Sequence, residues 1–249
     1  MPKRFVVTAS EFSDVPLFGV DSPVDPATGL PSGGDLAEAL TAAARQLHEP
    51  VTPHGTLCTA VRLAVRLMPG AEHAGVSVVE RGSPSRSLAW TDELVRSAGA
   101  GQTAEGPGSH LADLWTTPVR RVEDSASDDA GRPLAELGLR SALSLRLRAD
   151  RRRLTVLTAY ARHPRAFDDA ATRVGRLFTA HVSIALDAAT VREQLTEAMR
   201  TRDLIGQATG ILMERLGIDA AAAFENLVRA SQRENVKLRD LARRVVDTA

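Results

Sequence analysis

The stretch Arg202-Asp203-Leu204-Ile205-Gly206-Gln207-Ala208-Thr209-Gly210-Ile211-Leu212-Met213-Glu214-Arg215 decides how the C-terminal part of this chain is interpreted. Its apolar residues recur at helical spacing and predict an amphipathic helix. Gly206 and Gly210 lie four residues apart, on one face of that helix. Glycine costs an exposed helix about 1 kcal/mol relative to alanine. We therefore interpret the pair as leaving room for the close approach of a ligand or of another backbone.

The residues after this stretch predict two further short helices. Gly217 is suited to end the first helix and Asp219 to cap the next, because glycine favours helix C-termini and aspartate accepts hydrogen bonds from free backbone N–H groups. Apolar residues then recur at helical spacing through 221–231 and, after a turn at 234–236, through 238–246. Residues 202–249 therefore predict an all-α three-helix bundle.

Motifs on all three predicted helices resemble those of the ANTAR domain, a three-helix RNA-binding module of bacterial transcription antiterminators. The motifs are Arg202…Ile205-Gly-Gln-Ala-x-Gly210-Ile-Leu-Met213, Ala223-Phe224…Leu227 and Asn235-x-Lys237-Leu238…Ala242. The resemblance implies that this segment binds RNA hairpin loops in nascent mRNA leaders and promotes antitermination, and so acts on the RNA polymerase elongation complex indirectly. Loops suit such recognition because their unstacked bases are open to protein contacts.

The resemblance also implies a set of RNA-binding residues. Cationic and amide side chains would contact phosphates and base edges, and small residues would let the RNA approach the helices. The implied set is Arg202, Gln207, Thr209, Gly210, Ser231, Asn235, Lys237 and Arg243. Thr209 is a departure, since many family members carry a basic residue there, and its presence removes one phosphate contact.

Residues 35–187 predict an α+β domain. The predicted elements, in order, are helices at 36–47 and 57–67, strands at 74–80 and 87–90, short helices and a strand within 92–137, a hairpin of strands at 141–148 and 154–161, and a long helix. This order, together with Glu105-Gly106-Pro107, Arg140-Ser141 and Ala166-Phe167-Asp168, resembles the GAF domain, a sensor fold with an antiparallel sheet flanked by helices. The resemblance implies a small ligand or a signalling partner of unknown identity at the sensor.

A heptad pattern connects the two predicted domains. From Val174 onward, apolar or small residues alternate in steps of four and three, at Leu177, His181, Ile184, Ala188, Val191, Leu195 and Ala198. A helix facing the sensor core explains the first half of this pattern equally well, whereas beyond Ala188 a dimer contact is the better explanation. We therefore expect residues 174–201 to form a long coiled-coil linker of a homodimer.

Composition excludes several classes of protein. The chain has 31 Lys+Arg and 31 Asp+Glu, so its net charge is zero and any nucleic-acid surface must be local. Residues 229–244 are such a local segment, with six basic and two acidic residues. The single cysteine, Cys58, excludes an intrachain disulfide and a multi-cysteine metal cluster. No stretch approaches the about 18 apolar residues of a membrane span, so we expect a cytoplasmic protein without membrane contact.

The sequence carries no residue set typical of an enzyme or of a cofactor site. Ser109, His110 and Asp113 cluster on one short segment, whereas the members of a hydrolase triad converge from separate segments. The glycine-rich loop 99–108 fits neither the dinucleotide-binding motif nor the P-loop, and the histidines form no pair at metal-ligand spacing. We expect a protein that is not an enzyme, with no metal and no cofactor.

Residues 1–34 contain several prolines without sustained periodicity and predict a mostly disordered arm. Arg151-Arg152-Arg153, at the tip of the predicted hairpin, could bind phosphates, but an exposed turn also favours charged residues. The last two helices could act as a helix-turn-helix on DNA or through protein contacts, which is the alternative to RNA binding.

Overall fold

The computed structural model describes residues 33–81, 83–99, 111–127 and 131–248. The chain separates into two compact units, with the boundary between Thr190 and Val191, which we call the sensor unit and the bundle unit. The expectations for the arm, for the loop 100–108 and for Ser109 and His110 lie outside the described residues.

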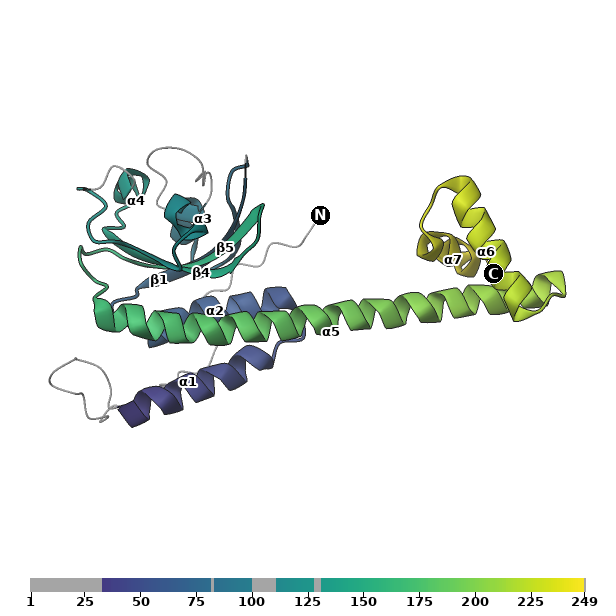
Figure 1. The fold of residues 1–249 in the computed structure, drawn as a ribbon, viewed down its shortest axis with the longest axis horizontal. Helices are drawn as coiled ribbons and strands as arrows, with labels where there is room; N and C mark the ends of the chain where they lie inside the picture. Colours follow the sequence, from purple (N-terminus) through teal and green to yellow (C-terminus); the bar gives the residue numbers. More distant parts are fainter. Residues whose placement is uncertain (1–32, 82, 100–110, 128–130, 249) are drawn as a thin grey trace. The chain divides into compact units, whose positions relative to one another are not determined.

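The sensor unit has the predicted α+β fold (Figure 1). Its elements are α1 (Gly33–His48), α2 (Pro53–Leu67), β1 (His73–Glu80), β2 (Arg86–Trp90), α3 (Glu93–Gly99), the 3-10 helix η2 (Ala112–Trp115), β3 (Val119–Val122), α4 (Arg132–Glu136), β4 (Ser141–Ala149), β5 (Arg153–Ala161) and the first part of α5 (Asp169–Leu216). Helices α1, α2 and α5 lie on one side of the sheet, and α3 and α4 lie on the other. The predicted antiparallel sheet flanked by helices is confirmed.

The five-stranded sheet has the order β2-β1-β5-β4-β3, and all of its pairs are antiparallel. The predicted β4–β5 hairpin is present, with Leu143 opposite Ala159 and Leu145 opposite Leu157. Asp150 closes the turn, because its carboxylate accepts hydrogen bonds from the backbone N–H groups of Arg152 and Arg153, both at 2.8 Å.

The main core fills the space between the sheet and the three long helices. Leu143, Leu145 and Leu147 alternate with polar residues, so strand geometry sends all three to this side, where they pack with Phe178 of α5. Gly175 permits the close approach of α5 to β4, since a Cβ at this position would lie 2.8 Å from Cδ1 of Leu145.

The opposite face of the sheet carries two smaller apolar clusters. One gathers around Tyr160 with residues of α3 and the segment 134–142, and the other contains Val79, Leu111, Leu114, Leu154 and Val156. Polar side chains are also buried on this face, where the hydroxyl oxygens of Ser144 and Thr158 lie 3.0 Å apart in a hydrogen bond. Arg146 donates hydrogen bonds from Nη1 to the carbonyl oxygens of Leu114 and Trp115, both at 3.2 Å.

Within the sensor unit, α5 has an inward and an outward stripe. Val174, Phe178 and Val182 are buried against the sheet, whereas Leu177 and Ile184 on the other side of the helix are exposed. Val174 therefore belongs to the sensor core and not to the outward stripe that begins at Leu177. Ser183 fastens the helix to β4 through a hydrogen bond of 3.1 Å to the carbonyl oxygen of Leu147, and Arg148 forms an ion pair with Asp187.

The bundle unit consists of the second part of α5, α6 (Ala220–Glu234) and α7 (Leu238–Asp247). Its buried centre is small and contains Ala208, Ala223, Leu227, Leu241 and Ala242. The predicted helix ends are present: Gly217 has a φ of 61°, and the Asp219 carboxylate accepts a hydrogen bond from the N–H of Ala222 at 2.7 Å. The expected three-helix arrangement is confirmed.

Candidate nucleic-acid interface

The two glycines of α5 face open space. A Cβ built on Gly206 or Gly210 would meet nothing within 4 Å in the described part of the chain. Both residues are exposed, and Ala208, which faces the bundle core, is completely buried. Packing within the chain therefore does not require glycine at either position. The pair leaves an unobstructed helix face that a partner molecule can approach closely.

Cations around the bundle divide into paired and unpaired groups. Arg239 contacts Glu197 at 3.4 Å, Arg244 contacts Glu234 at 2.8 Å, and Arg229 contacts Glu225 at 3.9 Å. By contrast, the exposed side chains of Arg202, Arg233, Lys237 and Arg243 are among those to which the structure gives no carboxylate partner within the residues it describes. The unpaired cations can bind phosphates without first breaking an ion pair within the chain.

Three of these unpaired cations are residues that the family resemblance implied, and Arg233 is an addition. Charge counting could not identify Arg233, because it does not show which of the clustered arginines are neutralised by a neighbouring carboxylate. The Arg239–Glu197 pair depends on how α7 lies along α5, and the Arg244–Glu234 pair depends on how α7 lies against α6. Arg239 near the start of α7 contacts Glu197, and Arg215 donates a hydrogen bond of 3.0 Å to the carbonyl oxygen of Thr248 at its end.

Ser231 and Asn235 shape the turn between α6 and α7. The Ser231 hydroxyl donates a hydrogen bond of 2.6 Å to the carbonyl oxygen of Val236, and Asn235 adopts a left-handed conformation with a φ of 53° at the end of α6. Asparagine tolerates this conformation better than most residues. The turn places Lys237 at the N-cap of α7, where its side chain makes no capping hydrogen bond. Ser231 and Asn235 therefore have a structural role, because they shape the turn that presents Lys237.

The remaining residues of the implied set lie on α5. Gln207 and Gly210 are exposed, while the Thr209 hydroxyl donates a hydrogen bond of 2.8 Å to the carbonyl oxygen of Ile205 within the helix. Arg202, Gly206 and Gly210 follow one another at intervals of four and share one face of α5. The glycine face, Gln207 and the unpaired cations are thus all accessible within the bundle unit, whereas the Thr209 hydroxyl is engaged by its own helix.

The sensor unit offers buried polar groups on the sheet face away from α5. Burial raises the pKa of the Tyr160 hydroxyl to about 12, so this group stays protonated at neutral pH. The indole Nε1 atoms of Trp90 and Trp115 are buried and have no hydrogen-bond partner in the described chain. Such donors suit a polar ligand, but the loop 100–108, which the sequence places beside this region, lies outside the described residues.

The acidic and histidine side chains of the described ranges do not assemble into a metal site. No group of three or more such residues there could hold a metal ion. His73 lies 2.7 Å from Asp92, and His163 lies 2.9 Å from Glu72, as separate pairs. Over the same ranges, no helix is both long enough and apolar enough to cross a membrane.

Comparisons with known proteins match both units. The family model for the GAF domain matches residues 51–187, and the family model for the ANTAR domain matches residues 193–246. Among curated proteins, none matches the chain.

Solved structures of photoreceptors share the fold of the sensor. The chromophore-binding domain of a bacteriophytochrome from R. palustris aligns with a TM-score of 0.51 at 14% identity, covering 64% of this chain and 62% of that one. The phytochrome photosensory core module of Stigmatella aurantiaca aligns with a TM-score of 0.54 at 11% identity, covering 77% of this chain and 44% of that one. The chain thus spans less than two thirds of these proteins, and at such identities the likeness concerns the fold alone.

Proposed function

This chain belongs to the GAF domain family and carries an ANTAR domain after its sensor, and we propose that it is a signal-responsive regulator that binds RNA hairpin loops in nascent transcripts and promotes transcription antitermination. Both domains are regulatory. The observation that carries the proposal is the open glycine face of α5 in the same small unit as the unpaired cations Arg202, Lys237 and Arg243.

The chemistry of this surface fits an RNA loop. Exposed guanidinium and ammonium groups bind phosphates, and Gln207 offers an amide that can donate to and accept from a base edge. Gly206 and Gly210 present only backbone, so splayed bases can lie against the helix. Stabilising one RNA hairpin excludes a competing terminator hairpin, so RNA polymerase continues elongation without contacting the protein directly. Such a regulator acts in the cytoplasm, on transcripts as they emerge.

A homodimer is part of the proposal. Leu177 is 51% exposed and Ile184 61% exposed in the sensor unit, and Val191 is 53% exposed and Leu195 60% exposed in the bundle unit. Four large apolar side chains at heptad spacing, each more than half exposed, are typical of a seam that a second helix covers. A second copy of α5 fits this seam because it carries the same pattern.

The test compares nucleic acids and variants in an electrophoretic mobility assay. We expect the full chain to bind a hairpin RNA more tightly than duplex DNA of matched length, and we expect Arg202→Ala to weaken the RNA complex. Arg229→Ala is the matched control, because Arg229 is an exposed arginine of the same unit that already contacts Glu225. Equal or tighter binding to duplex DNA would favour the helix-turn-helix alternative, and failure to bind either would favour protein contacts.

A further inference from the structure

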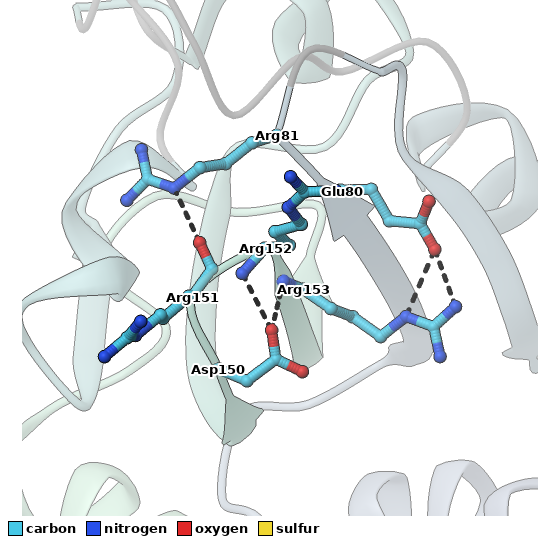
Figure 2. A pocket seen from close by; sticks show the side chains of 6 residues that line it. All are labelled: Glu80, Arg81, Asp150, Arg151, Arg152 and Arg153. Carbon is cyan, nitrogen blue, oxygen red and sulfur yellow. Dashed lines mark hydrogen bonds and ion pairs between the residues drawn. The ribbon is translucent and has the colours of Figure 1, made fainter.

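A second basic surface lies on the sensor unit, at the tip of the β4–β5 hairpin (Figure 2). An open pocket of about 730 Å³ is lined by Glu80, Arg81, Asp150, Arg151, Arg152 and Arg153. The lining holds four arginines and two carboxylates, so its net charge is +2. Arg153 has the largest effect in lowering the pKa of the Glu80 carboxyl, and the positive charge of Arg86 nearby lowers it further. We call these six lining residues the hairpin pocket.

The two carboxylates of the pocket are already engaged. Glu80 accepts two hydrogen bonds from the Arg153 guanidinium, at 2.6 and 3.1 Å. Asp150 accepts the backbone N–H groups of Arg152 and Arg153. Neither carboxylate therefore neutralises the guanidinium groups of Arg81, Arg151 or Arg152, which have no carboxylate partner among the residues that the structure describes.

Arg81 is held in place without losing its charge. Its guanidinium lies 4.4 Å from the centre of the Trp115 ring, and its Nε donates a hydrogen bond of 3.1 Å to the carbonyl oxygen of Arg151. Both contacts leave the two terminal nitrogens of Arg81 without an acid. Figure 2 shows the Arg81 and Arg151 guanidinium groups extending to the same side of the hairpin, away from the Arg153–Glu80 pair. The held guanidinium of Arg81, beside the exposed one of Arg151, matches the oxygens of phosphate groups.

The lining of the pocket favours a polymer over a small ligand. Sites for small molecules are usually enclosed and mostly apolar, whereas every lining residue here is charged and all except the half-buried Glu80 are exposed. The nearby Trp115 ring has one face occupied by the Arg81 guanidinium, so that face is not open to a base. A chain of phosphates held by several exposed cations needs no apolar wall.

We infer that the hairpin pocket is a second RNA-binding site, which contacts backbone phosphates through Arg81, Arg151 and Arg152 without reading sequence. This inference rests on the proposed function, because it takes RNA as the polyanion. The hairpin pocket differs from the candidate surface of the bundle unit in position and in chemistry. The bundle offers a helix face and an amide for base edges, whereas the hairpin offers only charge.

The test uses the full chain and fluorescence anisotropy with a hairpin RNA between 50 and 200 mM salt. Arg151→Gln/Arg152→Gln removes two phosphate contacts and should lower the slope of log K against log salt by about 1.4, so that the wild-type affinity falls about 7-fold more than that of the variant over this range. Arg45→Gln/Arg173→Gln removes the same charge from exposed positions of α1 and α5 and should leave the slope unchanged. Arg151→Lys/Arg152→Lys should restore it, which also controls for damage to the turn.

Each other outcome has a definite meaning. If Arg151→Gln/Arg152→Gln and the control Arg45→Gln/Arg173→Gln show the same salt slope of RNA binding, the hairpin does not bind RNA and the inference is wrong. It is also wrong if calorimetry shows that the hairpin variant loses binding of ATP or pyrophosphate while its RNA slope stays unchanged, since the pocket would then serve a free phosphorylated solute. If the wild type binds no RNA at all, the proposed function itself fails. If Arg243→Ala weakens binding and the hairpin variant does not, only the second site is refuted.

Discussion

Substituting Gly210 by leucine separates the helix-forming role of this position from its proposed role in binding. Gly210 is exposed and a Cβ added there would meet nothing within 4 Å in the described chain, so the position has room for a side chain. Leucine is the better helix former, so we expect the bundle to gain about 0.5–1 kcal/mol of unfolding free energy and roughly 2–8 °C in Tm. In a close RNA complex the same side chain overfills the contact, at a cost of about 1–3 kcal/mol, or about 5- to 150-fold in affinity.

The assay pairs thermal unfolding with RNA titration for a graded series. Gly210→Ala should stabilise the bundle by about 1 kcal/mol and weaken binding less than Gly210→Leu. Ala221→Leu is the control, because it adds nearly the same bulk at an exposed position of α6. A Gly210→Leu variant that is stable and binds RNA as well as the wild type would refute the proposal that RNA lies on the glycine face. Conversion of a dimer to a monomer by this substitution, seen by light scattering, would refute it too and assign the face to the dimer contact.

Other perturbations address the linker, the bundle cations and the hairpin turn. Ile184→Asp or Leu195→Asp should halve the mass measured by light scattering, since burying an unpaired carboxylate in the seam costs several kcal/mol; an unchanged mass would exclude the seam as the dimer contact. Arg243→Ala should lower the salt slope of RNA binding by about 0.7 to 0.9 and weaken all sequences alike, whereas Gln207→Ala should relax discrimination between loop sequences by about 1–3 kcal/mol; the opposite pattern in competition titrations would contradict these roles. Backbone hydrogen bonds from Arg152 and Arg153 hold the pKa of the Asp150 carboxyl below its usual value. The stabilisation of the folded protein by this carboxylate is therefore present above about pH 3.9, the unfolded pKa, and is lost as the pH falls through the lower pKa of the folded state. An ordinary pKa in an NMR titration would show that the turn is not closed by this carboxylate.

Local patterns in the sequence predicted much of the fold. The β4–β5 hairpin could be predicted because alternation in Leu143, Leu145 and Leu147 depends only on strand geometry. The ends of the bundle helices could be predicted because Gly217 and Asp219 act within one turn of their own positions. Periodicity could not divide α5 into its two stripes, since Val174 and Leu177 are both apolar and only tertiary packing buries one and exposes the other.

The candidate site was predictable in composition but not in the role of each residue. Motif resemblance included Ser231 and Asn235 in the binding set, and the structure assigns both a part in the α6–α7 turn. Their contacts depend on where the chain turns back, which spacing along the sequence does not specify. The same reason applies to Arg239 and Arg233, because ion pairing of one and not the other follows from three-dimensional neighbours.

The small core of the bundle unit has a consequence for the lifetime of the protein in a cell. Three of its five buried apolar residues are the alanines Ala208, Ala223 and Ala242, which bury little surface. Units of this size rarely derive more than about 3–5 kcal/mol from their core. A ligand present at a hundred times its Kd adds about 2.7 kcal/mol. Molecules with RNA bound should therefore resist proteases far better than molecules without it. Degradation of the vacant ones would then keep the abundance of the regulator in step with the supply of its target.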